Sequence, residues 1–241
     1  MKVIVCENYD QASEKCAEIF AEQLKAKPDS ILGLATGSTP IGTYKALTKK
    51  YENGEISFKR VKVFNLDEYY GIPKTHDQSY AYFMKDNLFD HVDIDQANCN
   101  IEDGMAKDYE AECKRYDDLQ AATCDGLDVQ LLGIGPNGHV GFNEPADFFT
   151  AGTHRVELED STIEANARFF ASKSDVPTSA LTVGMKTIMS AKHVVLIATG
   201  AAKIYAVNAM LNGPVTPKVP ASILQLHPNV TVIVDKAAMG K

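Results

Sequence analysis

Short apolar runs alternate with longer segments of helical periodicity along this chain. The apolar runs predict buried strands over residues 2–6, 31–34, 61–65, 127–132, 193–198 and 230–234. Between them, apolar residues recur three and four positions apart and predict helices over 10–25, 41–51, 79–88, 106–121 and 201–211. This alternation predicts an α/β fold with an open, mostly parallel, Rossmann-like sheet and helices on both faces.

The periodicity is weakest between residues 148 and 178, where only a short helix near 162–169 is predicted. Long irregular stretches in compact folds often have a functional role, so we expect a lid around residues 140–180 rather than a second domain. No composition shift marks a linker, and we expect one domain over residues 1–241.

Composition excludes several classes of partner. The 241-residue chain is 45% hydrophobic and has a net charge of −8, with its Lys and Arg residues scattered. Nucleic-acid binding needs clustered cations, so it is not expected, and no run approaches the ~20 apolar residues of a membrane span. Five widely spaced cysteines without a CxxC motif argue against a disulfide framework or a zinc site, and they fit a reducing cytoplasm.

Hydroxyl groups and a glycine follow the predicted strand 31–34. Thr36, Gly37, Ser38 and Thr39 precede a predicted helix, whose N-terminus favours an anion. The segment lacks the GKT or GKS ending of a nucleoside-triphosphate loop. An N-capping turn without a ligand remains the alternative.

Two adjacent carboxylates, Asp67 and Glu68, follow the predicted strand 61–65. Neighbouring side chains on extended backbone point to opposite faces, so at most one of them is expected to enter a cleft directly. A carboxylate in a cleft can act as a general base, whereas the alternative is a solvated acidic turn.

Residues 133–145, GIGPNGHVGFNEP, follow the predicted strand 127–132. They match GxGxxG, but a dinucleotide site needs a helix at these glycines, and Asn143-Glu144-Pro145 excludes one. His139 and Glu144 lack helical ligand spacing and a third ligand, which argues against a metal. A His beside a carboxylate suits proton transfer near neutral pH.

Two cations complete the set of candidate residues. Lys203 opens a predicted helix after a strand, where a cation is unfavourable for the helix dipole unless an anion binds there. Arg168 lies in the segment ANARFF at 165–170. For either residue, a surface cation is the alternative.

These segments together resemble the glucosamine-6-phosphate deaminase (isomerase) family. The matching pieces are LATGSTP at 34–40, FNLDEY at 64–69, residues 133–145, ANARFF at 165–170, ALTVG at 180–184 and SILQLH at 222–227. The resemblance covers essentially the whole chain in order. GHVGFNEP at 138–145 is highly specific, whereas TGSTP also resembles 6-phosphogluconolactonases.

The resemblance implies an enzyme that converts glucosamine 6-phosphate and water into fructose 6-phosphate and ammonia in amino-sugar catabolism, without a metal or an organic cofactor. It implies that Asp67 takes the C2 proton and returns it to C1, and that His139, tuned by Glu144, opens the pyranose ring. It places the phosphate on the loop 36–39, with Arg168 and Lys203.

Two departures qualify the resemblance. Many relatives have Asp where this chain has Asn137, so a charged relay to His139 is not expected, although Asn137 can still hydrogen-bond to it. The chain ends at Lys241, short of an extension found in allosteric hexameric relatives. This favours a non-allosteric monomer, while a homo-oligomer remains open.

Two other functions compete with the deaminase reaction. One is a 6-phosphogluconolactonase-like hydrolase, which needs no base at C2. The other is a non-catalytic sugar-phosphate sensor domain, which would be expected to have an added DNA-binding segment. The joint presence of Asp67, His139 and Glu144 favours catalysis.

Overall fold

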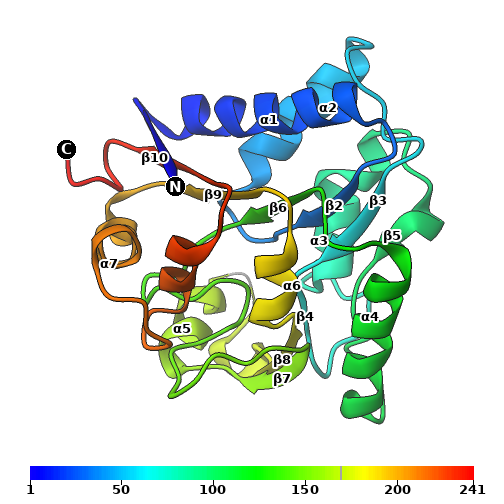
Figure 1. Cartoon of the computed structure of the whole chain (residues 1–241). Helices are drawn as coiled ribbons and strands as arrows, with labels where there is room; N and C mark the ends of the chain where they lie inside the picture. Colours follow the sequence, from blue (N-terminus) through cyan, green and yellow to red (C-terminus); the bar gives the residue numbers. More distant parts are fainter. Residues whose placement is uncertain (169) are drawn as a thin grey trace.

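A seven-stranded parallel sheet forms the centre of the computed structural model, which describes residues 1–168 and 170–241 (Figure 1). Its strand order is β1-β10-β9-β6-β2-β3-β5, and every pairing is parallel. The strands are Lys2–Cys6 (β1), Ile31–Leu34 (β2), Lys62–Asn65 (β3), Cys99–Asn100 (β5), Val129–Leu132 (β6), Val194–Ala198 (β9) and Val230–Asp235 (β10). The predicted α/β architecture is therefore confirmed.

Helices cover both faces of this sheet, with α1 and α2 along one face and α6 and α7 on the opposite side (Figure 1). The α-helices are Tyr9–Ala26 (α1), Ile41–Glu52 (α2), Tyr80–Asn87 (α3), Tyr109–Thr123 (α4), Asp160–Ala167 (α5), Met185–Ser190 (α6) and Ile204–Asn212 (α7). Short 3₁₀ helices span Phe89–His91 (η1), Gln96–Asn98 (η2), Lys173–Asp175 (η3), Ala201–Lys203 (η4) and Pro220–Leu226 (η5).

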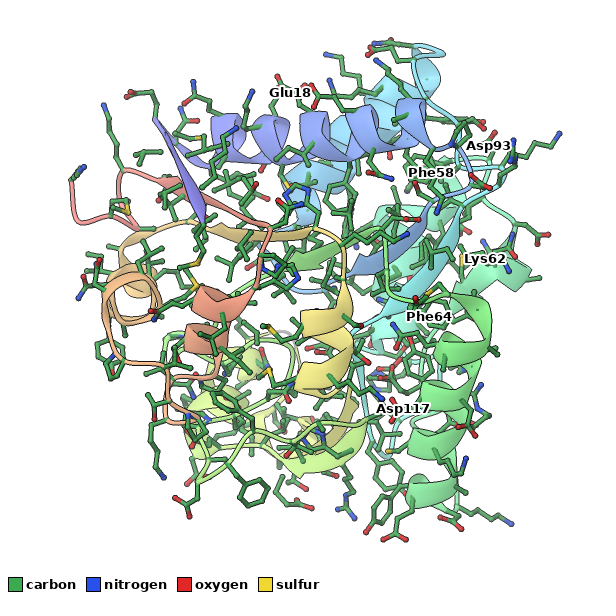
Figure 2. All side chains as sticks on the ribbon, in the orientation of Figure 1. Glu18, Phe58, Lys62, Phe64, Asp93 and Asp117 are labelled. Carbon is green, nitrogen blue, oxygen red and sulfur yellow. The ribbon has the colours of Figure 1, made fainter. Side chains whose placement is uncertain are left out.

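Helix α1 shows how the sequence determines these elements. Asn8 caps its N-terminus, because the side chain accepts a hydrogen bond from the Gln11 amide. The face formed by Ala12, Cys16 and Phe20 is fully buried. Glu18 lies on the outer side of the same helix (Figure 2). The apolar periodicity thus fixes which face of α1 packs on the sheet.

The main core lies between the sheet and its helices, and strands β6, β9 and β10 are buried along their whole length. Phe64 on β3 lies within this core (Figure 2) and packs edge-on against Tyr116 of α4, with 5.8 Å between ring centroids. Burial on both faces explains why these strands appear as continuous apolar runs in the sequence.

A second, three-stranded antiparallel sheet was not predicted from the sequence. It has the order β4-β8-β7, with strands Asp67–Tyr69 (β4), His154–Glu157 (β7) and Ser179–Thr182 (β8). The segment expected to be an irregular lid, residues 140–180, therefore contains strand β7 and helix α5 and ends within strand β8. The predicted helix near 162–169 corresponds to α5, and its last residue, Phe169, lies outside the described residues.

Hydrogen bonds join this small sheet to the loop after β6. The Val183 amide donates to the Leu66 carbonyl at 2.8 Å, and the Asn143 side chain donates to the Val183 carbonyl at 2.9 Å. The Phe142 amide donates to the Thr182 hydroxyl at 3.2 Å. The residues around Asp67, β8 and the loop 133–145 therefore form one connected unit.

Two properties of the described chain bear on its environment. None of the helices among the described residues is both long and apolar enough to cross a membrane. All five cysteines are free thiols.

Candidate active site

A cleft of about 1100 Å³ opens at the carboxyl ends of β9, β6, β2 and β3. These four strands are neighbours in the sheet. From β2 the chain continues outward to β3, whereas from β6 it proceeds in the other direction to β9. Such a reversal of strand order leaves a crevice between the diverging loops, which is where open α/β sheets bind ligands.

The cleft brings together residues that are far apart in the sequence. Nine of the ten predicted site residues line it: Thr36, Gly37, Ser38, Thr39, Asp67, Asn137, His139, Arg168 and Lys203. The tenth, Glu144, lies behind His139 and contacts it directly. The structure therefore assembles the full predicted set in one place.

The loop 36–39 lies directly before α2, with Gly37 at a φ of +93°, a conformation that other residues rarely adopt. Tyr9 of α1 holds this loop, since its hydroxyl donates to the Ser38 carbonyl at 3.2 Å and accepts from the Gly42 amide at 2.8 Å. Loop amides and hydroxyls at a helix N-terminus suit an anionic group such as phosphate.

Two cations approach the same loop. Arg168, directly after α5, donates to the Ser38 hydroxyl at 3.4 Å. Lys203 in η4 is partly buried, and this burial, together with the charge of Arg168, lowers its pKa from the ordinary value. A bound anion would restore favourable electrostatics for both cations.

Asp67 and Glu68 face opposite ways, as expected for neighbours on a strand. Asp67 lines the cleft. Glu68 turns to the start of α3, where it accepts hydrogen bonds from the amides of Tyr80 and Ala81 at 2.8 and 2.9 Å, and it also accepts one from the Tyr69 amide of its own strand at 2.8 Å. The prediction that only one carboxylate enters the cleft is confirmed.

Burial gives Asp67 the properties of a base that works near neutral pH. The residue is only 5% exposed, and burial, with a smaller contribution from the Glu68 charge, raises its pKa from 3.8 to about 8. Proton transfer is most efficient when the pKa of the catalytic group lies near the working pH. Asp67 can therefore both accept and return a proton.

His139, Asn137 and Glu144 form a hydrogen-bonded cluster on the loop after β6. Glu144 Oε2 lies 3.1 Å from His139 Nδ1 and accepts from Asn137 Nδ2 at 2.8 Å, while Thr162 of α5 donates to Glu144 Oε1. Burial alone would raise the Glu144 pKa, but these bonds and the His139 charge outweigh it and lower the pKa.

This cluster determines the role of the imidazole. Because the ionised Glu144 carboxylate can only accept, it selects the tautomer with the proton on Nδ1, so that in the neutral imidazole Nε2 is the acceptor. Gly135 makes room for the ring, since a Cβ at this position would lie 2.3 Å from His139 Cε1. His139 is thus held as a proton acceptor at the wall of the cleft.

The alternative ligands considered for this loop find no support in its geometry. Residues 133–153, all described, contain no helix, so the glycines do not open the helix of a dinucleotide site. Within residues 1–168 and 170–241, no group of three or more His, Cys, Asp or Glu side chains could hold a metal ion.

Several cleft residues were missed from the sequence. Tyr80 and Phe142 line the cleft with stacked rings 5.7 Å apart, and Tyr9 and Thr162 support the loop 36–39 and Glu144, respectively. Tyr80 and Phe142 are apolar enough to be taken as core residues. Tyr9 and Thr162 act through contacts distant in sequence, so no local pattern distinguishes them.

The chain is similar to known proteins along its whole length. The sequence model of the protein family described as glucosamine-6-phosphate isomerases/6-phosphogluconolactonase matches residues 7–233. A glucosamine-6-phosphate deaminase of Clostridium botulinum (strain Langeland) is 52% identical over 241 residues, covering 100% of this chain and 98% of the relative. One of Halothermothrix orenii is 52% identical over 238 residues, covering 99% and 98%.

Solved structures show the same relationship. A structure described as a monomeric glucosamine-6-phosphate deaminase is 44% identical, with a TM-score of 0.97 and coverage of 100% of this chain and 99% of that one. A 6-phosphogluconolactonase from Thermotoga maritima shares the fold, with 21% identity, a TM-score of 0.76 and coverage of 98% and 99%.

Proposed function

The chain belongs to the family of glucosamine-6-phosphate isomerases and 6-phosphogluconolactonases, and on that premise we propose how its cleft performs the deaminase reaction. It is an enzyme of the glucosamine-6-phosphate deaminase type. It converts glucosamine 6-phosphate and water into fructose 6-phosphate and ammonia, a step of amino-sugar catabolism. The lactonases are more distant relatives, and their likeness concerns the fold alone.

The phosphate binds first in this proposal, on the loop 36–39. Its oxygens accept hydrogen bonds from the loop amides and from the hydroxyls of Ser38 and Thr39. Arg168 and Lys203, which line the same cleft, neutralise its charge. Binding energy from this remote group orients C1 and C2 of the sugar.

Ring opening then exposes the aldehyde at C1. His139 accepts the proton of the C1 hydroxyl through Nε2 and delivers it to the ring oxygen as the C1–O5 bond breaks. Glu144, hydrogen-bonded to Nδ1 at 3.1 Å, stabilises the positive charge that develops on the imidazole. Asn137 holds Glu144 in place at 2.8 Å.

Isomerisation follows at Asp67. Its carboxylate takes the C2 proton while the substrate ammonium gives a proton to the C1 carbonyl oxygen, which yields an enolamine, and the protonated carboxyl then returns its proton to C1. The resulting imine at C2 is hydrolysed by water, which releases ammonia and leaves the ketose. The raised pKa of Asp67, about 8, suits both halves of this transfer.

We propose further that the enzyme works as a monomer in the cytoplasm. The solved relative at 44% identity is described as monomeric. Five free thiols fit a reducing compartment. A small sugar phosphate is the only partner that this proposal requires.

One observation carries the proposal: a buried carboxylate of raised pKa and a carboxylate-bound imidazole line the same cleft as a phosphate-type loop. The test measures ammonia and fructose 6-phosphate released from glucosamine 6-phosphate. Asp67→Asn should abolish turnover while substrate still binds, and Asp86→Asn, an exposed position of α3 outside the cleft, should change neither. No ammonia from the wild-type chain at saturating substrate would refute the activity, and near-normal turnover by Asp67→Asn would remove Asp67 as the base.

A further inference from the structure

Asn137 donates to two carboxylates, and only one of them belongs to the cluster described above. Its Nδ2 lies 2.8 Å from Glu144 Oε2 and 3.3 Å from Glu159 Oε2. Its Oδ1 accepts from the backbone amide of His139 at 3.2 Å. All three polar positions of the Asn137 amide are therefore in use, and Glu159 occupies one of them.

From this arrangement we propose that Glu159 is a positioning residue for ring opening, which acts on His139 and Glu144 through Asn137. The proposal rests on the function proposed above. Glu159 immediately precedes α5, where its carbonyl accepts from the amides of Thr162 and Ile163. The same turn thus holds Glu159 against Asn137 and Thr162 against Glu144.

The contacts explain why an amide at position 137 needs this second carboxylate. Glu144 and Glu159 accept but cannot donate, so together they require that the NH₂ end of the Asn137 amide face them. The oxygen then meets the His139 amide. Without Glu159, one N–H loses its acceptor, and the amide can rotate away from Glu144, which loosens the carboxylate that orients His139.

Charge complementarity makes the relationship testable in both directions. An aspartate at position 137 would place its carboxylate at hydrogen-bonding distance from both Glu144 and Glu159, and three carboxylates would then repel one another. Removing the charge of Glu159 relieves part of that repulsion. The two compatible combinations are therefore an amide at position 137 with a carboxylate at 159, and a carboxylate at position 137 without one at 159.

The experiment compares wild-type enzyme with Glu159→Gln, Asn137→Asp and the double variant, and uses Glu157→Gln as the matched control. Glu157 is an exposed carboxylate two residues away that pairs with Arg155 at 2.7 Å. We expect Glu159→Gln to lower kcat about threefold to tenfold, as for loss of a charge-assisted hydrogen bond, with KM unchanged. Glu157→Gln should match the wild type.

The double variant gives the decisive comparison. Asn137→Asp alone should lose more kcat than Glu159→Gln, and its optimum should move to lower pH, where one carboxyl is protonated. Adding Glu159→Gln should raise kcat above that of Asn137→Asp and reverse the shift of the optimum. Losses that multiply in the double variant would overturn the proposal.

An isotope effect identifies the step. With substrate carrying deuterium at C2, slower ring opening in Glu159→Gln should reduce the isotope effect on kcat toward one, because proton removal by Asp67 then limits the rate less. A general structural defect would leave the isotope effect unchanged, which would contradict the proposal. Absence of activity in the wild type would refute the proposed function itself, whereas an active wild type with an unaffected Glu159→Gln would overturn only the role of Glu159.

Discussion

Asp67→Asn should make the protein more stable above neutral pH while it removes the base. Asparagine has nearly the shape of aspartate but no charge. In the fold, burial and the Glu68 charge raise the pKa of Asp67 from 3.8 to about 8. The folded state therefore binds this proton more tightly than the unfolded chain does, so ionisation of Asp67 opposes folding as pH rises.

The size of the effect follows from the same values. The pKa rises from 3.8 to about 8, and each unit corresponds to about 1.4 kcal/mol. Ionisation of Asp67 can therefore lower the free energy of unfolding by at most about 6 kcal/mol. Water in the cleft solvates part of the charge, so we expect Asp67→Asn to gain about 2–3 kcal/mol near pH 8. The gain should vanish below about pH 4, where the carboxyl is protonated in both states.

Urea unfolding of both proteins between about pH 4 and pH 9 measures this difference by linear extrapolation. Asp128→Asn is the control of opposite sign. Asp128 is also buried, but Lys192 and Lys27, at 2.9 and 2.5 Å, outweigh its burial and lower its pKa. Its substitution should destabilise the protein near neutral pH, and this loss should shrink as pH falls through the pKa of the folded state.

A difference between wild type and Asp67→Asn that does not depend on pH would contradict this reasoning, because it would show that the carboxyl ionises as readily in the fold as in water. A variant less stable than the wild type near pH 8 would show that the carboxylate stabilises the fold. Either result would also weaken the assignment of Asp67 as a base with a raised pKa.

Three further predictions concern the cleft. Lys203→Ala should raise KM for glucosamine 6-phosphate about tenfold or more through loss of a phosphate contact. The control Lys218→Ala, which removes one partner of an exposed ion pair, should leave KM unchanged. A KM of Lys203→Ala equal to that of the wild type would place the phosphate elsewhere. Gly135→Ala should lower kcat, because the added methyl group displaces His139, and unchanged kinetics would mean that the ring moves freely. Thr162→Val should lower kcat more than it raises KM, in steady-state assays, since it removes a donor from the buried carboxylate; a change in KM alone would refute this.

The parallel sheet could be predicted because its strands are buried on both faces and appear as apolar runs. Strands β6 and β9 show this most clearly. The short strands could not be predicted in this way. β4 has three residues and begins with two carboxylates, and β5 has two residues, so neither shows a period. Their pairing depends on partners more than thirty residues away.

The candidate site was predictable to the extent that its residues follow strands. Asp67, His139 and Lys203 all follow buried runs, and a parallel sheet places such positions at one edge. The sequence could not show that Glu159 reaches Asn137, or that Tyr9 supports the loop at Ser38. These contacts depend on how α5 and α1 pack, which local patterns do not encode.

The division of the fold into two sheets has a consequence for which sugars can react. The phosphate loop extends from β2 of the large sheet, whereas Asp67 stands on β4, which pairs with β8 of the small sheet, and the amide of Leu66 just before it donates to the Leu34 carbonyl of β2 at 3.2 Å. The supports for the two ends of the substrate are thus joined where β2 and β3 end, which fixes their separation. We expect a fixed separation between the phosphate loop and the carboxylate to discriminate between sugar phosphates of different chain length.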